Sequence, residues 1–289
     1  MMRRIESQHM GLVEQHQPQG NSTDCFGIYV CPICKNALEQ KAKKLMCHTC
    51  DLSYHIINGI PDFILEDISK SSNQIFRRIK AVDHLAKIYE SILWYPIVLN
   101  IYGGIGTPPL KELVRIVAEI VNMDKGLILD VACGPGTYGR HIASESNTVY
   151  GIDISMGMLH QGVSYVKKGN IPNVHFARAK VQQLPFREAI FDAAICCGAL
   201  HLFTDTVVAL QEIGRTMKEG ASLAVMTFIA GNRGILRFSR IREHINQNHG
   251  FHVFEIPELK QYLFKAGFEN FQPQLYGSAL LFSAQKQRV

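Results

Sequence analysis

The stretch Leu127-Ile-Leu-Asp130-Val-Ala-Cys-Gly134-Pro-Gly136-Thr137 decides the fold of this 289-residue chain. Its apolar start predicts a buried strand, and the glycines after the acidic residue predict a tight turn into a helix. A strand, a glycine-rich turn and a helix in this order are typical of doubly wound α/β sheets. Ligands of such sheets bind beyond the carboxyl ends of the strands, so we expect a ligand at this turn.

The sequence after this stretch alternates between short apolar runs and helical segments. We predict four more strands at residues 148–153, 174–177, 191–197 and 222–228. Helices are expected to begin at Ser155 and to span residues 205–217, and Pro108-Pro109 opens an earlier one. Apolar strands that alternate with helices form a parallel sheet covered on both faces. The chain is therefore predicted to have an α/β fold with a doubly wound sheet.

The residues around the turn indicate the charge of the ligand. Gly134 and Gly136 let the backbone approach a ligand closely, because they carry no Cβ atom. Asp153 ends the second strand, where its carboxylate can accept hydrogen bonds from ribose hydroxyls. The spacing of Gly134, Gly136 and Gly139 also matches the dinucleotide pattern GxGxxG. Asp130 argues against that alternative, since a carboxylate just before the turn repels a pyrophosphate and favours a cationic ligand.

At this point the sequence resembles the class I S-adenosylmethionine (SAM)-dependent methyltransferases. The stretch from Asp130 to Gly136 is similar to the first motif of that family, and Asp153 follows at the expected place. The resemblance continues through Gln183-Leu-Pro-Phe186, Phe191-Asp192, Ala199-Leu-His201, Glu212-Ile-Gly-Arg-Thr-Met-Lys-Glu-Gly220 and Leu263-Phe-Lys-Ala-Gly-Phe268. It covers residues 108–285 and implies a seven-stranded mixed sheet, the Rossmann-like methyltransferase fold, closed by an antiparallel strand pair.

The resemblance also implies which residues bind SAM. The implied set is Asp130, Ala132, Gly134, Gly136, Asp153, Ile154, Lys180, Val181 and Cys197. Asp130 and the glycine backbone would hold the methionine part, whose ammonium and sulfonium groups are cationic. Asp153 would bind the ribose and Ile154 would pack against the adenine, whose edge the Lys180–Val181 backbone would line.

Two positions depart from the family pattern. Lys180 stands where an acidic residue is frequent, and Ala132 stands where a glycine is frequent. We expect the Lys180 side chain to be a solvated surface lysine.

Eight cysteines fall into two groups. Cys31-Pro-Ile-Cys34 and Cys47-His-Thr-Cys50 are two CxxC pairs separated by twelve residues, a spacing close to that of zinc ribbons. A reducing cytoplasm disfavours disulfides, and a redox CxxC is expected once rather than as a matched pair. Four thiolates leave no open position on the metal, so Cys31, Cys34, Cys47 and Cys50 predict structural rather than catalytic zinc. His48 and His55 are alternative ligands, for which surface positions are expected.

The remaining cysteines and the composition limit the class of protein that this chain can be. Cys133, Cys196 and Cys197 lie in apolar segments, where free cysteine behaves as a small hydrophobe, and Cys25 is expected in a loop. The chain is 47% hydrophobic and 19% charged, which excludes wholesale disorder, and its net charge of +5 does not by itself indicate nucleic-acid binding. There is no secretory signal and no run of about 20 apolar residues, so we expect a cytoplasmic protein without a membrane span.

These patterns divide the chain into four parts. We predict a flexible leader at residues 1–24, a zinc ribbon at 25–66 and a linker with a connector helix at 67–107. The connector is interrupted at Pro96 and ends at Gly103-Gly104. Residues 108–289 form the methyltransferase domain, which carries a helical insertion at 229–254. This insertion is a lid over an apolar substrate, a basic ridge for RNA, or an ordinary amphipathic cover.

The methyl acceptor is the least determined feature. His201, just beyond the fourth strand, is the candidate general base, with pocket lining or packing as the alternative. The segment after Cys197 resembles methyltransferases of quinones and other small molecules, so we expect a small, largely apolar acceptor. A zinc ribbon followed by a methyltransferase domain also resembles ribosomal-RNA methyltransferases and plastid-associated plant methyltransferases. An RNA base is therefore the alternative acceptor. A non-catalytic scaffold with a degenerate SAM site is the alternative from another class, and no oligomeric state is predicted.

Overall fold

The computed structural model describes residues 26–66, 94–104, 106–122, 125–231, 233–249 and 251–288. The leader, Cys25 and residues 67–93 of the predicted connector lie outside these ranges. The connector does end in a helix, α2 (Trp94–Gly103), which stops where the Gly103-Gly104 pair predicts.

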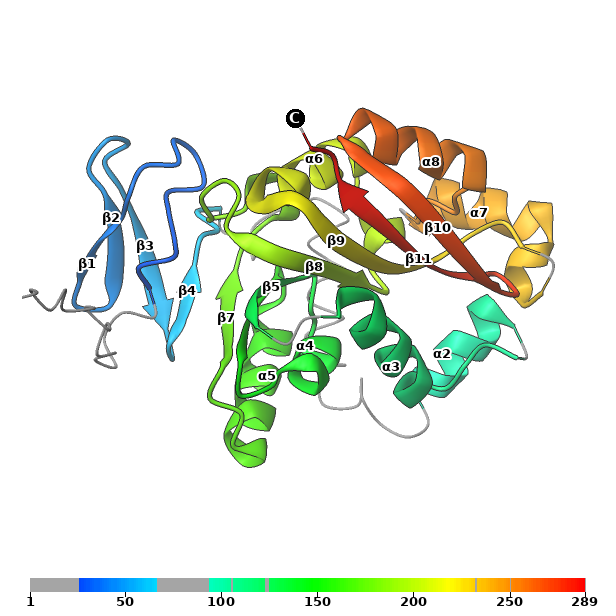
Figure 1. The fold of residues 1–289 in the computed structure, drawn as a ribbon, viewed down its shortest axis with the longest axis horizontal. Helices are drawn as coiled ribbons and strands as arrows, with labels where there is room; N and C mark the ends of the chain where they lie inside the picture. Colours follow the sequence, from blue (N-terminus) through cyan, green and yellow to red (C-terminus); the bar gives the residue numbers. More distant parts are fainter. Residues whose placement is uncertain are drawn as a thin grey trace, which may run out of the picture.

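The described strands form one eleven-stranded sheet with the order β1-β2-β3-β4-β7-β6-β5-β8-β9-β11-β10 (Figure 1). Its C-terminal seven strands are β5 (Gly126–Val131), β6 (Asn147–Asp153), β7 (Val174–Arg178), β8 (Phe191–Cys197), β9 (Met217–Phe228), β10 (Phe268–Tyr276) and β11 (Ala279–Lys286). Strands β5 to β9 run parallel, and β11 is antiparallel to both β9 and β10. Strand order reverses between β5 and its neighbour β8, which places the predicted turn at the switch point of the sheet.

The sheet therefore has more strands than the seven that we predicted. The four additional strands are β1 (Glu39–Lys41), β2 (Lys44–Cys47), β3 (Leu52–Ile57) and β4 (Ile60–Asp62). They form an antiparallel meander, and β4 pairs in parallel with β7 through Asp62 and Arg178. An edge strand has unpaired backbone groups that another strand can satisfy, which explains how the meander extends the sheet. We call residues 26–66 the ribbon and residues 108–289 the C-terminal domain.

Helices cover both faces of the sheet in the C-terminal domain. The described ones are α3 (Leu110–Val121), α4 (Thr137–Ile142), α5 (Met156–Gly169), α6 (Thr206–Thr216), α7 (Ser239–His249) and α8 (Ile256–Lys265). Figure 1 shows α3, α4 and α5 on one face and α6 and α8 on the other. Helices α5 and α6 begin where the sequence predicts. Ser155 and Asp205 cap them by accepting hydrogen bonds from backbone N–H groups.

The core of the ribbon continues into the C-terminal domain. Tyr29, Tyr54 and Phe63 of the ribbon belong to the same buried cluster as Phe186 and Phe191. The Tyr29 and Phe186 ring centroids are 5.3 Å apart, and the two residues form an antiparallel bridge. The ribbon therefore does not complete a core of its own within residues 26–66.

The insertion at residues 229–254 has two helical segments among its described residues. It contains a short 3-10 helix, η3 (Ile235–Arg237), and α7. Ile245 is buried, Ile241 is half-buried and Phe238 remains exposed under the guanidinium of Arg237, 4.4 Å from its ring centroid. The backbone N–H of His252 donates to the carbonyl of His201 at 2.7 Å, so the insertion is joined to the segment after β8.

Candidate active site and metal centre

The turn after β5 has the backbone shape that its glycines predict. Gly134 and Gly136 have φ values of 57° and 75°, in the left-handed region. A Cβ on Gly136 would lie 2.9 Å from the ring of Phe176, so packing inside the domain itself requires glycine there. Ala132 also has a positive φ, 52°, although a glycine would adopt it with less strain.

Two carboxylates lie together at this turn. Asp130 is almost fully buried, and its Oδ2 accepts a hydrogen bond from the Gly139 N–H at 3.1 Å. The pKa of Asp130 is raised to about 7, chiefly by burial and also by the neighbouring charge of Asp153. Asp153 accepts from the N–H groups of Gly134 and Ser155, both at 2.8 Å. Asp153 therefore fixes the turn from the neighbouring strand.

This pair of carboxylates fits a cationic ligand. The buried Asp130 and the half-buried Asp153 repel one another when both are ionised, and burial disfavours the charge on Asp130. A positively charged ligand relieves both effects, whereas a pyrophosphate increases the repulsion. The two carboxylates thus suit the ammonium and sulfonium of SAM and not a dinucleotide.

The expected adenine edge lies at the ends of β6 and β7. The carbonyl of Ile154 accepts a hydrogen bond from Arg178 Nε at 2.9 Å. After β7 the chain forms a 3-10 helix, η1 (Val181–Gln183), in which Val181 is buried. Lys180 precedes this helix and pairs with Glu66 of the ribbon, with 2.8 Å between Nζ and Oε1. The Lys180 side chain is 32% exposed, so it remains partly solvated and is held in an ion pair at the surface.

His201 and Cys197 lie at the carboxyl end of β8. His201 lies in a 3-10 helix, η2 (Leu200–Leu202), where burial lowers its pKa to about 3. Its ring packs 4.6 Å from Phe251 and 5.2 Å from Phe228, measured between centroids. Burial raises the pKa of Cys197, so this thiol is protonated and unreactive. The same holds for Cys133 and Cys196, as the sequence predicts.

The four ribbon cysteines converge. Their sulfur atoms all lie within 4.8 Å of one another, with 3.4 Å between Cys34 and Cys47 and 4.0 Å between Cys31 and Cys50. Four sulfurs around zinc at about 2.3 Å are separated by about 3.8 Å, so the cluster has the size of a tetrahedral thiolate site. His48 instead pairs with Glu39 at the surface and does not join the cluster.

Residues that join the ribbon to the C-terminal domain were missed in the sequence. Asp62 and Arg178 form a half-buried ion pair at 2.9 Å, with side chains 12% and 14% exposed. Lys35 contacts Glu212 at 2.7 Å and donates to the Leu184 carbonyl at 3.0 Å. These partners are separated by more than 100 residues, and no local pattern marks them.

Comparisons with known proteins agree with this geometry. Residues 128–220 match a family model described as a methyltransferase domain. An uncharacterised chloroplastic methyltransferase of Arabidopsis thaliana is 28% identical over 90% of this chain and 79% of its own length. The ubiquinone/menaquinone biosynthesis C-methyltransferase UbiE of Shewanella piezotolerans is 26% identical over 60% of this chain and 71% of its own.

A solved structure shows the same fold. Phosphoethanolamine N-methyltransferase 2 of Haemonchus contortus, in complex with phosphomonomethylethanolamine and S-adenosylhomocysteine, matches with a TM-score of 0.60 and 17% identity, over 75% of this chain and 60% of that one. The chain is therefore a SAM-dependent methyltransferase. Its C-terminal domain has the Rossmann-like fold of class I.

Proposed function

We propose that this methyltransferase transfers the methyl group of SAM to a small, largely apolar acceptor. The supporting observation is an aromatic cluster at the carboxyl ends of β8 and β9, which consists of Tyr102, His201, Phe228 and Phe251. Tyr102 stacks on Phe251 with 5.7 Å between centroids, and both are only partly buried. A partly exposed aromatic wall beside the switch point is suited to a flat, apolar molecule.

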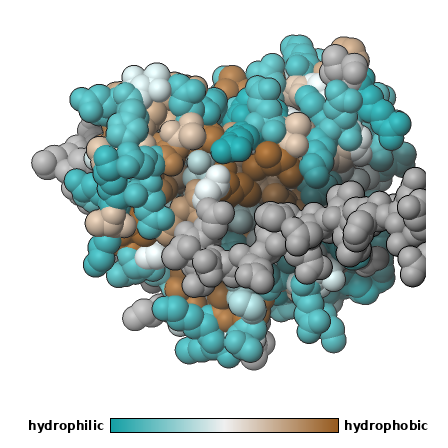
Figure 2. Space-filling view, turned by 60° about the vertical axis from the view of Figure 1, so that its left-hand side comes forward, coloured by the Kyte–Doolittle hydropathy of each residue, from teal (hydrophilic) through white to brown (hydrophobic). Residues whose placement is uncertain are grey.

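Exposed apolar side chains of α2 and η2 and the relatives support the same class of acceptor. Figure 2 shows apolar residues gathered in the middle of one face, with hydrophilic residues around them. Large apolar side chains that stay exposed include Ile97 and Ile101 of α2 and Leu202 of η2. One relative is described as a quinone-biosynthesis C-methyltransferase, and a quinone ring is a flat, apolar acceptor of this kind.

The residues at the turn are proposed to bind the cofactor. When bound, SAM supplies an activated methyl group on a sulfonium. Asp130 and the backbone of Gly134 and Gly136 hold its cationic end, and Asp153 binds the ribose. The adenine base is bordered by Ile154, Val181 and Lys180. Ala132 in the turn and Cys197 at the end of β8 complete the proposed set. The domain aligns donor and acceptor and excludes water, which is the main requirement of such a transfer.

His201 is proposed to line the acceptor site rather than to remove a proton. An imidazole with a pKa of about 3 is neutral at physiological pH and binds a proton weakly. Its Nδ1 is 3.3 Å from the Thr227 hydroxyl, which orients the ring within the aromatic cluster.

The ribbon cysteines are proposed to bind a structural zinc ion. Tyr54, whose hydroxyl is 3.3 Å from the Cys31 sulfur, packs the site against the shared core.

No helix among the described residues is long and apolar enough to cross a membrane. We retain the cytoplasm as the proposed location, although the Arabidopsis relative is described as chloroplastic.

The acceptor is tested with radiolabelled SAM and fractionated cell extract. Label in the organic-soluble fraction is expected, and label in RNA would overturn the proposed acceptor class. The variant Phe251→Ala should lose most of this labelling while it retains SAM binding, because it removes one aromatic wall and leaves the turn intact. Calorimetric titration with SAM forms the control, since an absence of heat at high concentration would favour the scaffold alternative.

A further inference from the structure

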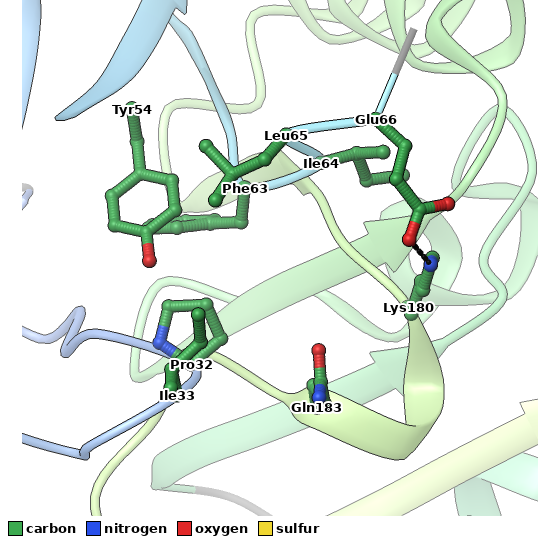
Figure 3. A pocket seen from close by; sticks show the side chains of 9 residues that line it. All are labelled: Pro32, Ile33, Tyr54, Phe63, Ile64, Leu65, Glu66, Lys180 and Gln183. Atoms are coloured by element: carbon green, nitrogen blue, oxygen red, sulfur yellow. Dashed lines mark hydrogen bonds and ion pairs between the residues drawn. The ribbon is translucent and has the colours of Figure 1, made fainter. Parts of the chain in front are cut away.

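A cavity lies at the junction between the ribbon and the C-terminal domain. Its volume is about 130 Å³, and its apolar walls include Pro32, Ile33 and Phe63 of the ribbon (Figure 3). Lys180 and Gln183 line it from the other domain, and Glu66 reaches Lys180 across its edge. The cavity therefore combines apolar walls with a charged pair.

The sheet order shows how this junction lies relative to the cofactor site. β5, β6 and β7 are consecutive neighbours, and they carry the Asp130 turn, Asp153 and the segment before η1 at their carboxyl ends. Neighbouring strands are about 4.8 Å apart, so the end of β7 lies about 10 Å from that of β5. A ligand with its cationic end at β5 and its ribose at β6 reaches β7 with its base. The Glu66–Lys180 pair borders this third position.

The charged pair has the chemistry to recognise a purine. The side chains of Glu66 and Lys180 are 60% and 32% exposed, so a ligand can reach both. A purine with an exocyclic amine offers donors at the amine and acceptors at its ring nitrogens. A carboxylate accepts from the first, and an ammonium group donates to the second. We propose that the ribbon completes the base subsite of the cofactor, with Glu66 accepting a hydrogen bond from the exocyclic amine of adenine. This inference rests on the proposed cofactor-binding set.

The contacts around the junction hold Glu66 in position. Four residues before it, Asp62 pairs with Arg178, and Arg178 also donates to the carbonyl of Ile154 beside the expected base. The Phe63 N–H donates to the Arg178 carbonyl at 2.8 Å. One arginine thus connects the ribbon strand that leads to Glu66 with the end of β6. The ribbon and the base subsite are therefore joined by direct bonds.

The experiment is calorimetric titration of the full chain with S-adenosylhomocysteine and with S-inosylhomocysteine, in which a carbonyl replaces the exocyclic amine. The unaltered protein is expected to bind the adenosine compound about tenfold more tightly, the usual effect of one charge-assisted hydrogen bond. Glu66→Ala should lose about tenfold in affinity for the adenosine compound and bind both compounds equally. Glu66 is exposed, so its replacement leaves the fold unchanged.

Glu39→Ala is the matched control, since Glu39 is an exposed ribbon carboxylate that pairs with Lys41 away from the junction. This variant should keep the affinity and the preference of the unaltered protein. The inference is overturned if Glu66→Ala retains the preference for the adenosine compound, or if Glu39→Ala loses it equally. Failure of the unaltered protein to bind either compound would instead contradict the proposed cofactor site.

Discussion

The ribbon and the C-terminal domain share one sheet but are stabilised differently. In the C-terminal domain, strands such as β5 and β8 are almost entirely buried between helices, so burial of apolar surface supplies most of the stability. In the ribbon, β1 is fully exposed, and in β3 only Tyr54 is buried while the other residues are half-buried or exposed. A unit of this size depends on its proposed metal and on the core of its neighbour. The comparison shows that one sheet can join a unit with its own core to one that depends on the core of its neighbour and on a proposed metal.

Removal of the metal is expected to have the largest effect and to unfold the ribbon before the C-terminal domain. Metal binding supplies about 10 kcal/mol to small zinc units, so Cys47→Ala should unfold β2 and β3 while α5 keeps its protection. Hydrogen exchange measured by mass spectrometry, together with the zinc content, checks this. Cys196→Ala is the control, because it removes a buried thiol of β8 and should leave the ribbon protected. Equal protection of β2 and β3 in Cys47→Ala would show that the ribbon does not depend on the metal.

The ion pair between Asp62 and Arg178 is the next test, because it joins the two units. Both side chains are less than 15% exposed, so removal of one partner leaves a poorly solvated charge. Asp62→Asn should lower the free energy of unfolding by about 3 kcal/mol, measured by urea denaturation. The exposed pair of Glu112 and Arg115 is the control, and Glu112→Gln should lower it by less than about 0.5 kcal/mol. Similar losses in the two variants would mean that the junction contributes no more than a surface contact.

A smaller effect is expected from pH, and it concerns the C-terminal domain. Burial raises the pKa of Asp130 to about 7, and a bound cation lowers that pKa because it favours the ionised carboxylate. Proton release therefore accompanies SAM binding below pH 7, and affinity falls as pH falls through this value. Calorimetry should show about tenfold weaker binding at pH 6 than at pH 8. In Asp130→Asn binding should be weak and nearly independent of pH, and an equal pH dependence in both proteins would exclude Asp130 as its source.

The sequence predicted the local features of the fold. The strand at residues 191–197 has the predicted limits, and Ser155 and Asp205 mark the starts of α5 and α6. These features depend on neighbouring residues, through apolar periodicity and capping. The turn after β5 and the convergence of the four ribbon cysteines follow from spacing in the same way.

The junction could not be predicted for a physical reason. The pairs that form it, such as Asp62 with Arg178 and Glu66 with Lys180, are ion pairs between residues more than 100 positions apart. Each member alone looks like an ordinary surface charge. The eleven-stranded sheet was missed for the same reason, since nothing near Ile60 indicates which edge its strand will join. His201 was found by its place after a strand, but its low pKa depends on packing by Phe228 and Phe251 from distant segments.

The position of Tyr29 has a consequence for how this protein can be divided. Its ring is buried against Phe63 of the ribbon and against Tyr150 and Phe186 of the C-terminal domain. Tyr29 therefore covers apolar surface of that domain. A truncated protein that starts at residue 67 would expose the rings of Tyr150 and Phe186 to water and become prone to aggregate. An exchange of the ribbon between related enzymes would therefore succeed only if the new ribbon has an aromatic side chain that fits the place of Tyr29.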